Sequence, residues 1–487
     1  MKYVRILCLA MLFLCSSAYA QYPGSTNLDS CFLFWMDSLH LPGLAASIVK
    51  NGEIIWTGAY GWANIENSIP ATDTTIWNLG SISKTVTAVA AMNAWEDDLF
   101  ELDQNINDLL PFDVVHYYYP NDTITPRNLL VHNSCVEDRW ALWSMLTVFG
   151  GDSPVPLDTF TYNYFNSSGY WYNSLNFLNY PPGSHWEYSN VGNSLAGYLT
   201  EAVADSFPVY CQQHIFDPLD MTRTSWFYAN LNLSNIAMPY VYSGGQYVPQ
   251  GYPSTCIYPS STLKSSVLDL TRFLMMFMQY GEFDSVRILD STTVALMRTI
   301  QDTITLFPNA YIGMTWWYFL SQYSGRWVWG HTGGWIGTSA TMMFCPAENS
   351  GAIILTNREV DTFNDLGPMV VVLLDWALQY GIAEHKTTVS GFANLMVSPN
   401  PFTQITDIRY QMTDNRATQS GQEVNIKIYD VSGRLAKDFG PFSIIGHQSS
   451  VQWDGTDQND SKLPGGVYFV TLHTGEFSDT KKVLFVR

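Results

Sequence analysis

The chain has 487 residues, and its acidic side chains outnumber the basic ones, which gives a formal charge of −20 at pH 7. Hydrophobic residues make up 47% of the chain and aromatic residues 15%, enough for a large core and too many for a disordered protein. Residues 21–394 hold 12 basic and 33 acidic groups, and so acidic a surface argues against nucleic-acid binding.

The first 20 residues have the pattern of a secretory signal peptide. Lys2 and Arg5 precede a short apolar run from Ile6 to Cys15, and an Ala-x-Ala sequence ends at Ala20. About ten apolar residues are too few to cross about 30 Å of hydrocarbon, so we expect a cleaved leader rather than an anchor. No later segment is long and apolar enough to span a membrane, and we expect no membrane span in the mature chain.

Cysteines are sparse beyond this leader. There are five, so at least one has no intramolecular disulfide partner, and their spacing is not typical of a metal site. We expect isolated buried thiols. In an oxidising compartment, the alternative is that two of these cysteines form one disulfide. We expect neither a metal nor a cofactor, because paired histidines, Cys-x-x-Cys and a phosphate-binding glycine loop are all missing. The five cysteines are Cys31, Cys135, Cys211, Cys256 and Cys345.

The main part of the chain begins and ends with predicted strands and has predicted helices between them. Residues 44–61 are predicted to form a hairpin that turns at Asn51-Gly52, and residues 327–356 a series of strands. This order favours an α+β fold whose sheet is completed by segments distant in sequence. Helices are predicted from apolar spacing at 85–95, 126–132, 191–205, 267–280, 291–300 and 368–378.

A change of pattern after Gly381 predicts a second domain. Residues 385–394 are predicted to be a polar linker. Short alternating segments with turn signals follow, which is typical of a small all-β sandwich. We therefore expect one domain over residues 21–384 and a second over residues 395–487.

A candidate nucleophile stands just before the helix predicted at 85–95. Ser81 is followed three residues later by Lys84, and a helix would place both side chains on one face about one turn apart. A lysine amine can activate a serine hydroxyl, and the N–H groups at a helix start favour negative charge. The same spacing occurs in less suitable predicted strand, loop and hairpin segments, at Ser47/Lys50, Ser261/Lys264 and Ser478/Lys481.

Two further motifs supply groups that an attack on a carbonyl needs. In Tyr188-Ser189-Asn190, the phenol offers a proton shuttle for the leaving group, and a cation such as Lys84 would favour its phenolate. His331-Thr332-Gly333-Gly334 lies between predicted strands, where glycine lets a substrate lie close to the backbone. Each motif is common when taken alone, so their order and context carry the argument.

In that order the motifs resemble the serine β-lactamase and penicillin-recognising family, in particular its class C and β-lactamase-related branch. The similarity extends over about residues 30–380 and includes the stretches 124–134, 182–190 and 330–334. It implies a β-lactamase/transpeptidase-like domain with an antiparallel sheet, flanking helices and a helical region.

The resemblance also implies a role for each motif residue. Ser81 would be the acylated nucleophile and Lys84 its base, while Tyr188 would serve the leaving group and then the deacylating water. The backbone N–H groups of Ser81 and Gly334 would form the oxyanion hole. The substrate would be contacted by Asn190, His331, Thr332 and Gly333.

One departure from the family pattern narrows the expected substrate. β-Lactamases usually carry a lysine where this chain has His331, a weaker and pH-dependent cation. We therefore expect a secreted serine hydrolase that acts on small acyl donors such as esters or D-amino-acid amides and peptides. A β-lactamase or a peptidoglycan D,D-peptidase is an alternative, and so is a non-catalytic surface binding protein that keeps the fold.

The C-terminal segment resembles the FlgD-like immunoglobulin or type IX secretion sorting domain. It contains the stretches Val397–Phe402, Trp453–Gly455 and Pro464–Phe469, and a basic pair at Lys481-Lys482. The resemblance implies an interaction with secretion machinery, export, and either removal of the domain or attachment to the cell surface.

Overall fold

The structure is a computed structural model, which describes residues 28–380, 394–400, 402–411, 423–430, 434–443, 448–473 and 478–486. The predicted signal peptide lies outside these residues, as does the predicted linker except for Asn394. The chain divides into two compact units, one up to residue 375 and one from residue 376. The predicted boundaries at 384 and 395 stay predictions.

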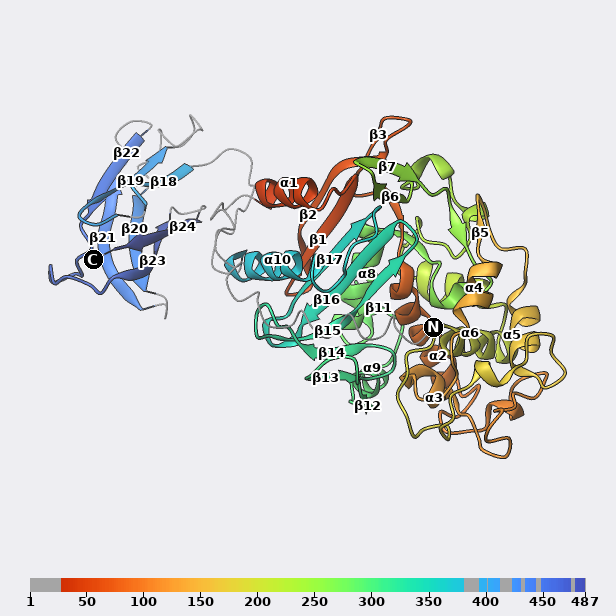
Figure 1. The fold of residues 1–487 in the computed structure, drawn as a ribbon. Helices are drawn as coiled ribbons and strands as arrows, with labels where there is room; N and C mark the ends of the chain where they lie inside the picture. The colour runs from red at the N-terminus through yellow and green to blue at the C-terminus, as the bar shows by residue number, and fades with distance from the viewer. Residues whose placement is uncertain are drawn as a thin grey trace. The chain divides into compact units, whose positions relative to one another are not determined.

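The first unit is built around a sheet of nine antiparallel strands (Figure 1). Its central pairing joins the two ends of the unit, because β1 and β17 are neighbours with Leu44 opposite Thr356. The predicted α+β fold, with a sheet completed by distant segments, is confirmed. The spatial order is β12 (Asp302–Thr303), β13 (Ala310–Ile312), β14 (Trp317–Leu320), β15 (Trp327–Trp335), β16 (Thr338–Cys345), β17 (Ser350–Thr356), β1 (Gly43–Lys50), β2 (Glu53–Asn64) and β3 (Ile69–Pro70).

The hairpin between β1 and β2 turns where the sequence predicts it. Asn51 and Gly52 have φ angles of 51° and 81°. Two successive positive φ angles are what a two-residue turn needs to match the twist of the strands, and asparagine and glycine adopt them most easily. This turn sets the register that places Ser47 opposite Thr57 and Ile48 opposite Trp56.

Helices cover both faces of the sheet. The hydroxyl groups of Ser47 on β1 and Thr271 on α8 lie 2.7 Å apart, so α8 covers the face that Ser47 occupies. Phe32 of α1 stacks on Trp56, which lies on the opposite face because side chains alternate along a strand. The helices are α1 (Leu28–Ser38), α2 (Ser83–Glu96), α3 (Pro126–Val131), α4 (Trp140–Leu146), α5 (Leu157–Phe165), α6 (Asn190–Val203), α7 (Phe207–Cys211), α8 (Val267–Met278), α9 (Ser291–Met297) and α10 (Leu366–Tyr380).

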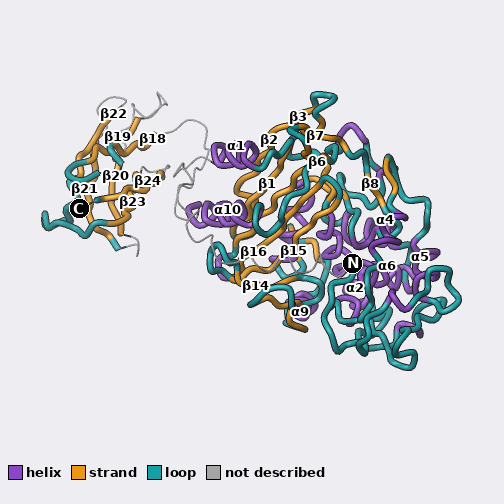
Figure 2. The backbone as a smooth tube through the Cα atoms, in the orientation of Figure 1, coloured by secondary structure: helices purple, strands orange, loops and turns teal. Residues whose placement is uncertain are grey.

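A helical region rich in loops lies beside the sheet (Figure 2). Helix α2 packs against α6, and the short turn η1 (Gly80–Ile82) before α2 contacts β15 and β16. The turn η7 (Tyr258–Ser260) packs on both α2 and α6. The start of α2 therefore lies where the sheet meets the helical region.

Four small sheets complete the unit, namely β4 (Ile76–Asn78) with β9 (Lys264–Ser266), β5 (Val148–Phe149) with β8 (Pro253–Ser254), β6 (Tyr240–Ser243) with β7 (Gln246–Pro249), and β10 (Glu282–Phe283) with β11 (Val286–Arg287).

The second unit contains two sheets that share one core, as the predicted all-β sandwich requires. One sheet has the order β18 (Asn394–Ser398), β19 (Thr406–Gln411), β22 (Gln448–Trp453), and the other β21 (Leu435–Ser443), β20 (Glu423–Asp430), β23 (Gly466–His473), β24 (Ser478–Phe485). Buried side chains from both sheets pack together. They include Leu395, Ile408, Ile426, Ile428, Trp453, Val470 and Phe485.

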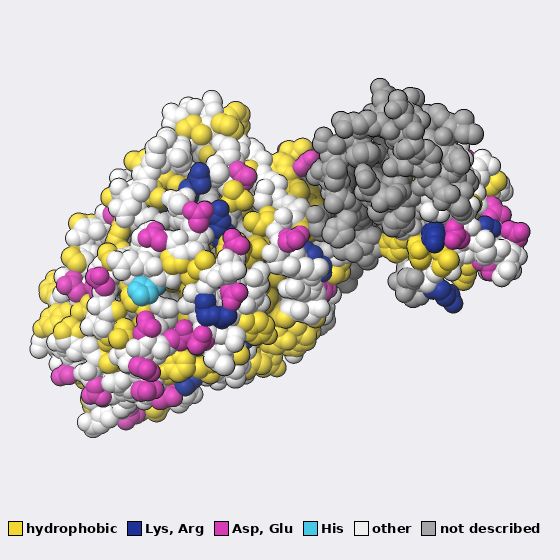
Figure 3. Space-filling model, turned by 180° about the vertical axis from the view of Figure 1, so that it is seen from behind, with side chains coloured by type: hydrophobic (Ala, Val, Ile, Leu, Met, Phe, Trp, Pro, Cys, Tyr) yellow, Lys and Arg dark blue, Asp and Glu magenta, His cyan; other side chains and the backbone are white. Residues whose placement is uncertain are grey.

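The acidic excess of the sequence is visible on the surface of the first unit. Figure 3 shows acidic side chains scattered over one face of the first unit, with few basic ones among them. Within the described residues, no helix combines the length and the apolar character that crossing a bilayer demands. The five cysteines beyond residue 20 are all described, and they are buried thiols rather than disulfides.

Candidate active site

The turn that carries Ser81 is held from both sides. Leu79 donates its backbone N–H to the Leu263 carbonyl at 2.9 Å, next to the pairing of β4 with β9. Gly80 has a φ of +53°, which favours glycine, and its N–H bonds the Asn78 side chain at 3.2 Å. The Ser83 hydroxyl donates to the Gly80 carbonyl at 2.6 Å. This bracing fixes the position of the serine hydroxyl at the start of α2.

Lys84 is fully buried and lies against Ser81. Its Nζ atom is 3.0 Å from the Ser81 Oγ, 2.7 Å from the Asn190 Oδ1 and 2.7 Å from the Ser260 carbonyl oxygen. Burial lowers the pKa of Lys84 to about 7, although the negative charge of Asp138 opposes this shift. A substantial fraction of the amine is therefore neutral at physiological pH.

Asn190 connects Lys84 to the buried carboxylate of Asp138. Its Nδ2 donates to Asp138 Oδ2 at 2.6 Å, and its backbone N–H donates to the same oxygen at 3.0 Å. The N–H of Val191 bonds the other carboxylate oxygen at 2.9 Å. Asp138 thus binds the free N–H groups at the start of α6, where negative charge is favourable. The predicted contact between Asn190 and substrate stays a prediction.

Tyr188 precedes α6 and lies beside the two residues of the serine–lysine pair. The Lys84 Nζ is 4.8 Å from the centroid of its ring. Burial raises the pKa of the phenol, and the interaction with the Ser81 side chain only partly offsets that rise. The phenol is therefore protonated at neutral pH and available as a proton donor.

His331 lies on β15 next to the same tyrosine, with ring centroids 6.2 Å apart. Burial, followed by the charge of Lys84, lowers the pKa of His331 to about 3. The imidazole is therefore neutral at ordinary pH, whereas the sequence had suggested a pH-dependent cation. Its Nδ1 lies 2.6 Å from the Thr332 carbonyl oxygen. Thr332 itself points to the other face of the strand, because side chains alternate along β15.

The two glycines of the third motif lie against the nucleophile turn. A Cβ atom on Gly333 would overlap the Leu79 carbonyl, so only glycine fits there. The Gly334 nitrogen is 2.9 Å from the position that a Cβ on Gly80 would take. The predicted oxyanion donors, the backbone N–H groups of Ser81 and Gly334, therefore come from segments in direct contact.

Sequence reasoning missed several residues that shape this site. Asp138 and Ser260 hold Asn190 and Lys84, and the rings of His132 and Trp317 lie 4.7 Å and 6.0 Å from that of Tyr188. Asp138 lies six residues after His132, within a stretch that carries no strong motif. Ser260 acts through its backbone carbonyl, which any residue type would supply, so no sequence signal marks it.

The arrangement has the parts of an acyl-transfer site. It presents a serine hydroxyl, an amine that is partly neutral near pH 7, a protonated phenol and two backbone N–H groups. Two of the three acceptors around Lys84, Asn190 Oδ1 and the Ser260 carbonyl, cannot donate hydrogen bonds. A neutral amine has two N–H groups for them, which leaves its lone pair directed at the Ser81 hydroxyl.

Two family models match separate parts of the chain. Residues 29–373 match the sequence model of Beta-lactamase, and residues 396–486 match that of a secretion system C-terminal sorting domain. The second match indicates export, an interaction with secretion machinery, and a final location outside the cell or on its surface.

Individual relatives are distant. Protein flp from Staphylococcus aureus is 24% identical over 322 residues, which are 65% of this chain and 60% of the relative. The chain thus spans less than two thirds of the length of the flp relatives it matches. An octameric penicillin-binding protein homologue from Pyrococcus abyssi has a TM-score of 0.58 at 19% identity and covers 93% of this chain and 99% of its own.

A further solved structure is EstCE1, described as a hydrolase with promiscuous acyltransferase activity. It has a TM-score of 0.56 at 18% identity and covers 72% of this chain and 97% of its own. Likeness at such low identity shows a shared fold.

Proposed function

Because the chain belongs to the Beta-lactamase family, we propose that it is a serine hydrolase that forms an acyl-enzyme on Ser81. One observation carries the proposal above the others. The Lys84 Nζ lies 3.0 Å from the Ser81 Oγ, and burial brings the pKa of this amine to about 7. A base with a pKa near the working pH is best suited to remove a proton from the nucleophile.

In the acylation step, the lone pair of Lys84 takes the Ser81 proton while Oγ forms a bond to the substrate carbonyl carbon. The carbonyl oxygen becomes an oxyanion, which the N–H groups of Ser81 and Gly334 stabilise. Removing one such donor from an enzyme typically lowers kcat by about 10²–10³-fold.

Collapse of the intermediate breaks the bond to the leaving group. Tyr188 donates its phenolic proton to the leaving oxygen or nitrogen, and the ammonium of Lys84 stabilises the phenolate so formed. Proton return from Lys84 restores the phenol. In deacylation a water loses its proton to the same pair and attacks the ester carbonyl, which releases the acid and regenerates Ser81.

The third motif supports neutral acyl donors over carboxylate-bearing ones. His331 has a pKa of about 3 and adds no positive charge at neutral pH. A substrate carboxylate would thus lack the cation that a β-lactamase usually offers in this position. We therefore propose esters or D-amino-acid amides and peptides as the substrate class. The similar fold of EstCE1, which is described as a hydrolase with promiscuous acyltransferase activity, supports acyl transfer as the type of reaction.

Labelling with a fluorophosphonate tests the nucleophile. The wild-type chain should be tagged and Ser81→Ala should not, because the probe bonds only to an activated serine. Ser261→Ala is the matched control, since it removes the serine of another Ser-x-x-Lys pair, and it should still be tagged. Persistent labelling of Ser81→Ala would refute the proposal.

A substrate panel then tests the acyl donor. We expect hydrolysis of p-nitrophenyl esters or D-alanyl amides and little turnover of a cephalosporin. Turnover of the cephalosporin with no ester or amide hydrolysis would favour a β-lactamase. A folded chain that neither labels nor turns over any of these donors would favour a non-catalytic binding protein.

A further inference from the structure

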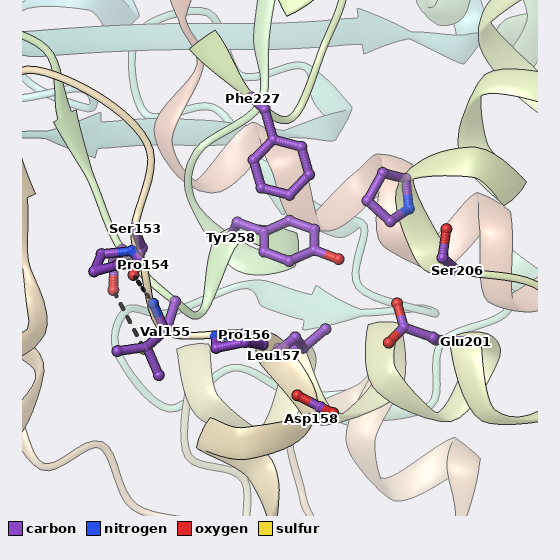
Figure 4. Close-up of a pocket in the computed structure, with 13 residues that line it drawn as sticks. Ser153, Pro154, Val155, Pro156, Leu157, Asp158, Glu201, Ser206, Phe227 and Tyr258 are labelled. Carbon is purple, nitrogen blue, oxygen red and sulfur yellow. Dashed lines mark hydrogen bonds between the residues drawn. The ribbon is translucent and has the colours of Figure 1, made fainter. Parts of the chain in front are cut away.

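A cavity outside the candidate active site lies near the C-terminal end of α6 (Figure 4). It has a volume of about 360 Å³, and its walls include the segment 153–158, Glu201, Ser206, Phe227 and Tyr258. Glu201 is eleven residues beyond Asn190 on the same helix, about 16 Å away at about 1.5 Å per residue. The volume lies in the range of small-molecule sites, about 300–1,000 Å³.

The cavity carries negative charge without a counter-ion. Glu201 and Asp158 both line it, and none of its lining residues is basic. The carboxylate of Glu201 accepts one backbone N–H, that of Phe207 at 2.8 Å. Burial raises the pKa of Glu201, and the carboxylates of Asp158 and Asp205 raise it further. A positively charged ligand would relieve this repulsion.

Aromatic rings form another part of the wall, and one of them carries a hydroxyl group. The rings of Phe227 and Tyr258 have centroids 4.9 Å apart, and in the view of Figure 4 the ring of Tyr258 lies between that of Phe227 and the side chain of Asp158. Tyr258 is only 6% exposed, and Figure 4 shows its hydroxyl pointing toward the side of the cavity that holds Ser206 and Glu201. A tyrosine hydroxyl can both donate and accept a hydrogen bond, so it can contribute to binding a polar ligand.

We propose that this cavity binds a small organic cation that carries a primary ammonium group. Its three N–H donors match the carboxylate oxygens of Glu201 and Asp158 and the hydroxyl oxygen of Tyr258. The rings of Phe227 and Tyr258 offer an apolar surface against which the organic part of such a ligand can pack. A metal ion fits less well, because no cluster of three or more His, Cys, Asp or Glu side chains suited to a metal occurs in the described part of the chain.

Titration calorimetry on the full chain with benzylammonium chloride tests the proposal. We expect saturable binding with one site per chain. Benzyl alcohol has a similar shape without the charge and should bind at least tenfold more weakly. Equal affinity for the two compounds, or no saturable binding of the ammonium, would overturn the proposal.

Variants then locate the binding site. Glu201→Gln keeps an acceptor for the Phe207 N–H and should weaken binding at least tenfold. Glu53→Gln removes the same charge from an exposed position on β2 and should leave the affinity unchanged. Tyr258→Phe should weaken binding severalfold, and it serves as a second probe if Glu201→Gln does not fold. Equal losses in Glu201→Gln and Glu53→Gln would show a bulk charge effect and refute the site.

Binding is also separable from catalysis. Ser81→Ala should bind benzylammonium as the wild type does, because the cavity shares no residue with the candidate active site. A loss of binding in Ser81→Ala would place the ligand in the active site and contradict the proposal. Conversely, the cavity could fail this test while Ser81 remained a nucleophile.

Discussion

Lys84 and Asp138 are joined by a single side-chain amide. Asn190 accepts a hydrogen bond from the Lys84 amine at 2.7 Å and donates one to the Asp138 carboxylate at 2.6 Å. Burial lowers the pKa of Lys84, and the charge of Asp138 opposes the shift, so that the amine has a pKa of about 7. The balance of these two effects sets the fraction of lysine able to act as a base.

The pH dependence of acylation should follow this amine. Only the neutral form of Lys84 accepts the Ser81 proton, so kcat/KM for a neutral ester should rise with pH to a plateau, with a midpoint near pH 7. Lys84→Arg stays protonated and should lower kcat/KM by about 10²–10⁴-fold, the usual contribution of a general base. Initial rates between pH 5 and 9 measure both effects, and a flat wild-type profile would contradict the assignment of Lys84.

Asp138→Asn should move this midpoint to lower pH. The negative charge of Asp138 raises the pKa of Lys84, so its removal leaves burial less opposed and the amine loses its proton more easily. Asp37→Asn changes the same charge at an exposed position on α1 and should leave the midpoint in place. A midpoint that rises, or that moves equally in both variants, would show that Asp138 does not act on Lys84.

Tyr188→Phe should affect substrates according to their leaving groups. The raised pKa keeps the phenol protonated, so its proposed role is to donate a proton to the departing atom. An amide nitrogen needs that proton, and kcat should fall by about 10²–10⁴-fold. A p-nitrophenolate leaves readily without it and should lose much less. Equal losses on matched D-alanyl anilide and p-nitrophenyl ester substrates would contradict proton donation by Tyr188.

Buried Lys264 should make the stability of the chain depend on pH. Burial lowers the pKa of Lys264 to about 7 in the folded state, against about 10.4 for an exposed lysine. Above pH 7 the unfolded chain therefore binds a proton that the folded chain lacks, so the free energy of unfolding rises with pH by up to about 1.4 kcal/mol per unit. Lys264→Met removes this contribution. Urea unfolding should show the wild type gaining about 2 kcal/mol on the variant between pH 7 and 9, and parallel profiles would contradict the shift.

The sequence predicts the fold well where the pattern is local. Asparagine and glycine at 51 and 52 specify the turn between β1 and β2, and apolar spacing predicts α2, α6 and α8 within a few residues. The resemblance identifies the Beta-lactamase family and the sorting domain, and both are confirmed. Helix α1 was not predicted, although Phe32 stacks on Trp56 of the sheet. Such packing depends on a residue 24 positions away, which local periodicity does not include.

Sequence can indicate site residues whose chemistry needs one particular side-chain type. It does not indicate residues whose place or charge in the site depends on what the fold packs around them. Ser81 and Lys84 stand out because their spacing suits a helix start. Asp138 gains its place from contacts with residues about 50 positions later, at the start of α6. The charge of His331 depends on burial, which lowers its pKa to about 3, and no residue type in the motif reveals that burial.

Substitution by alanine should be harmful at Gly333 of β15 and tolerated at its neighbour Gly334. Gly333→Ala places a methyl group on the Leu79 carbonyl and should push β15 away from the turn that holds Ser81. We expect a loss of about 1–3 kcal/mol in stability, as for other overpacked sites, and a large drop in the rate of fluorophosphonate labelling. Gly334→Ala is the matched control, because its nearest neighbour would be the Thr362 Cγ2 at 4.0 Å and its N–H is kept. Thermal unfolding and labelling rates compare the two, and similar losses in both would mean that contact between β15 and the nucleophile turn does not position the oxyanion donors.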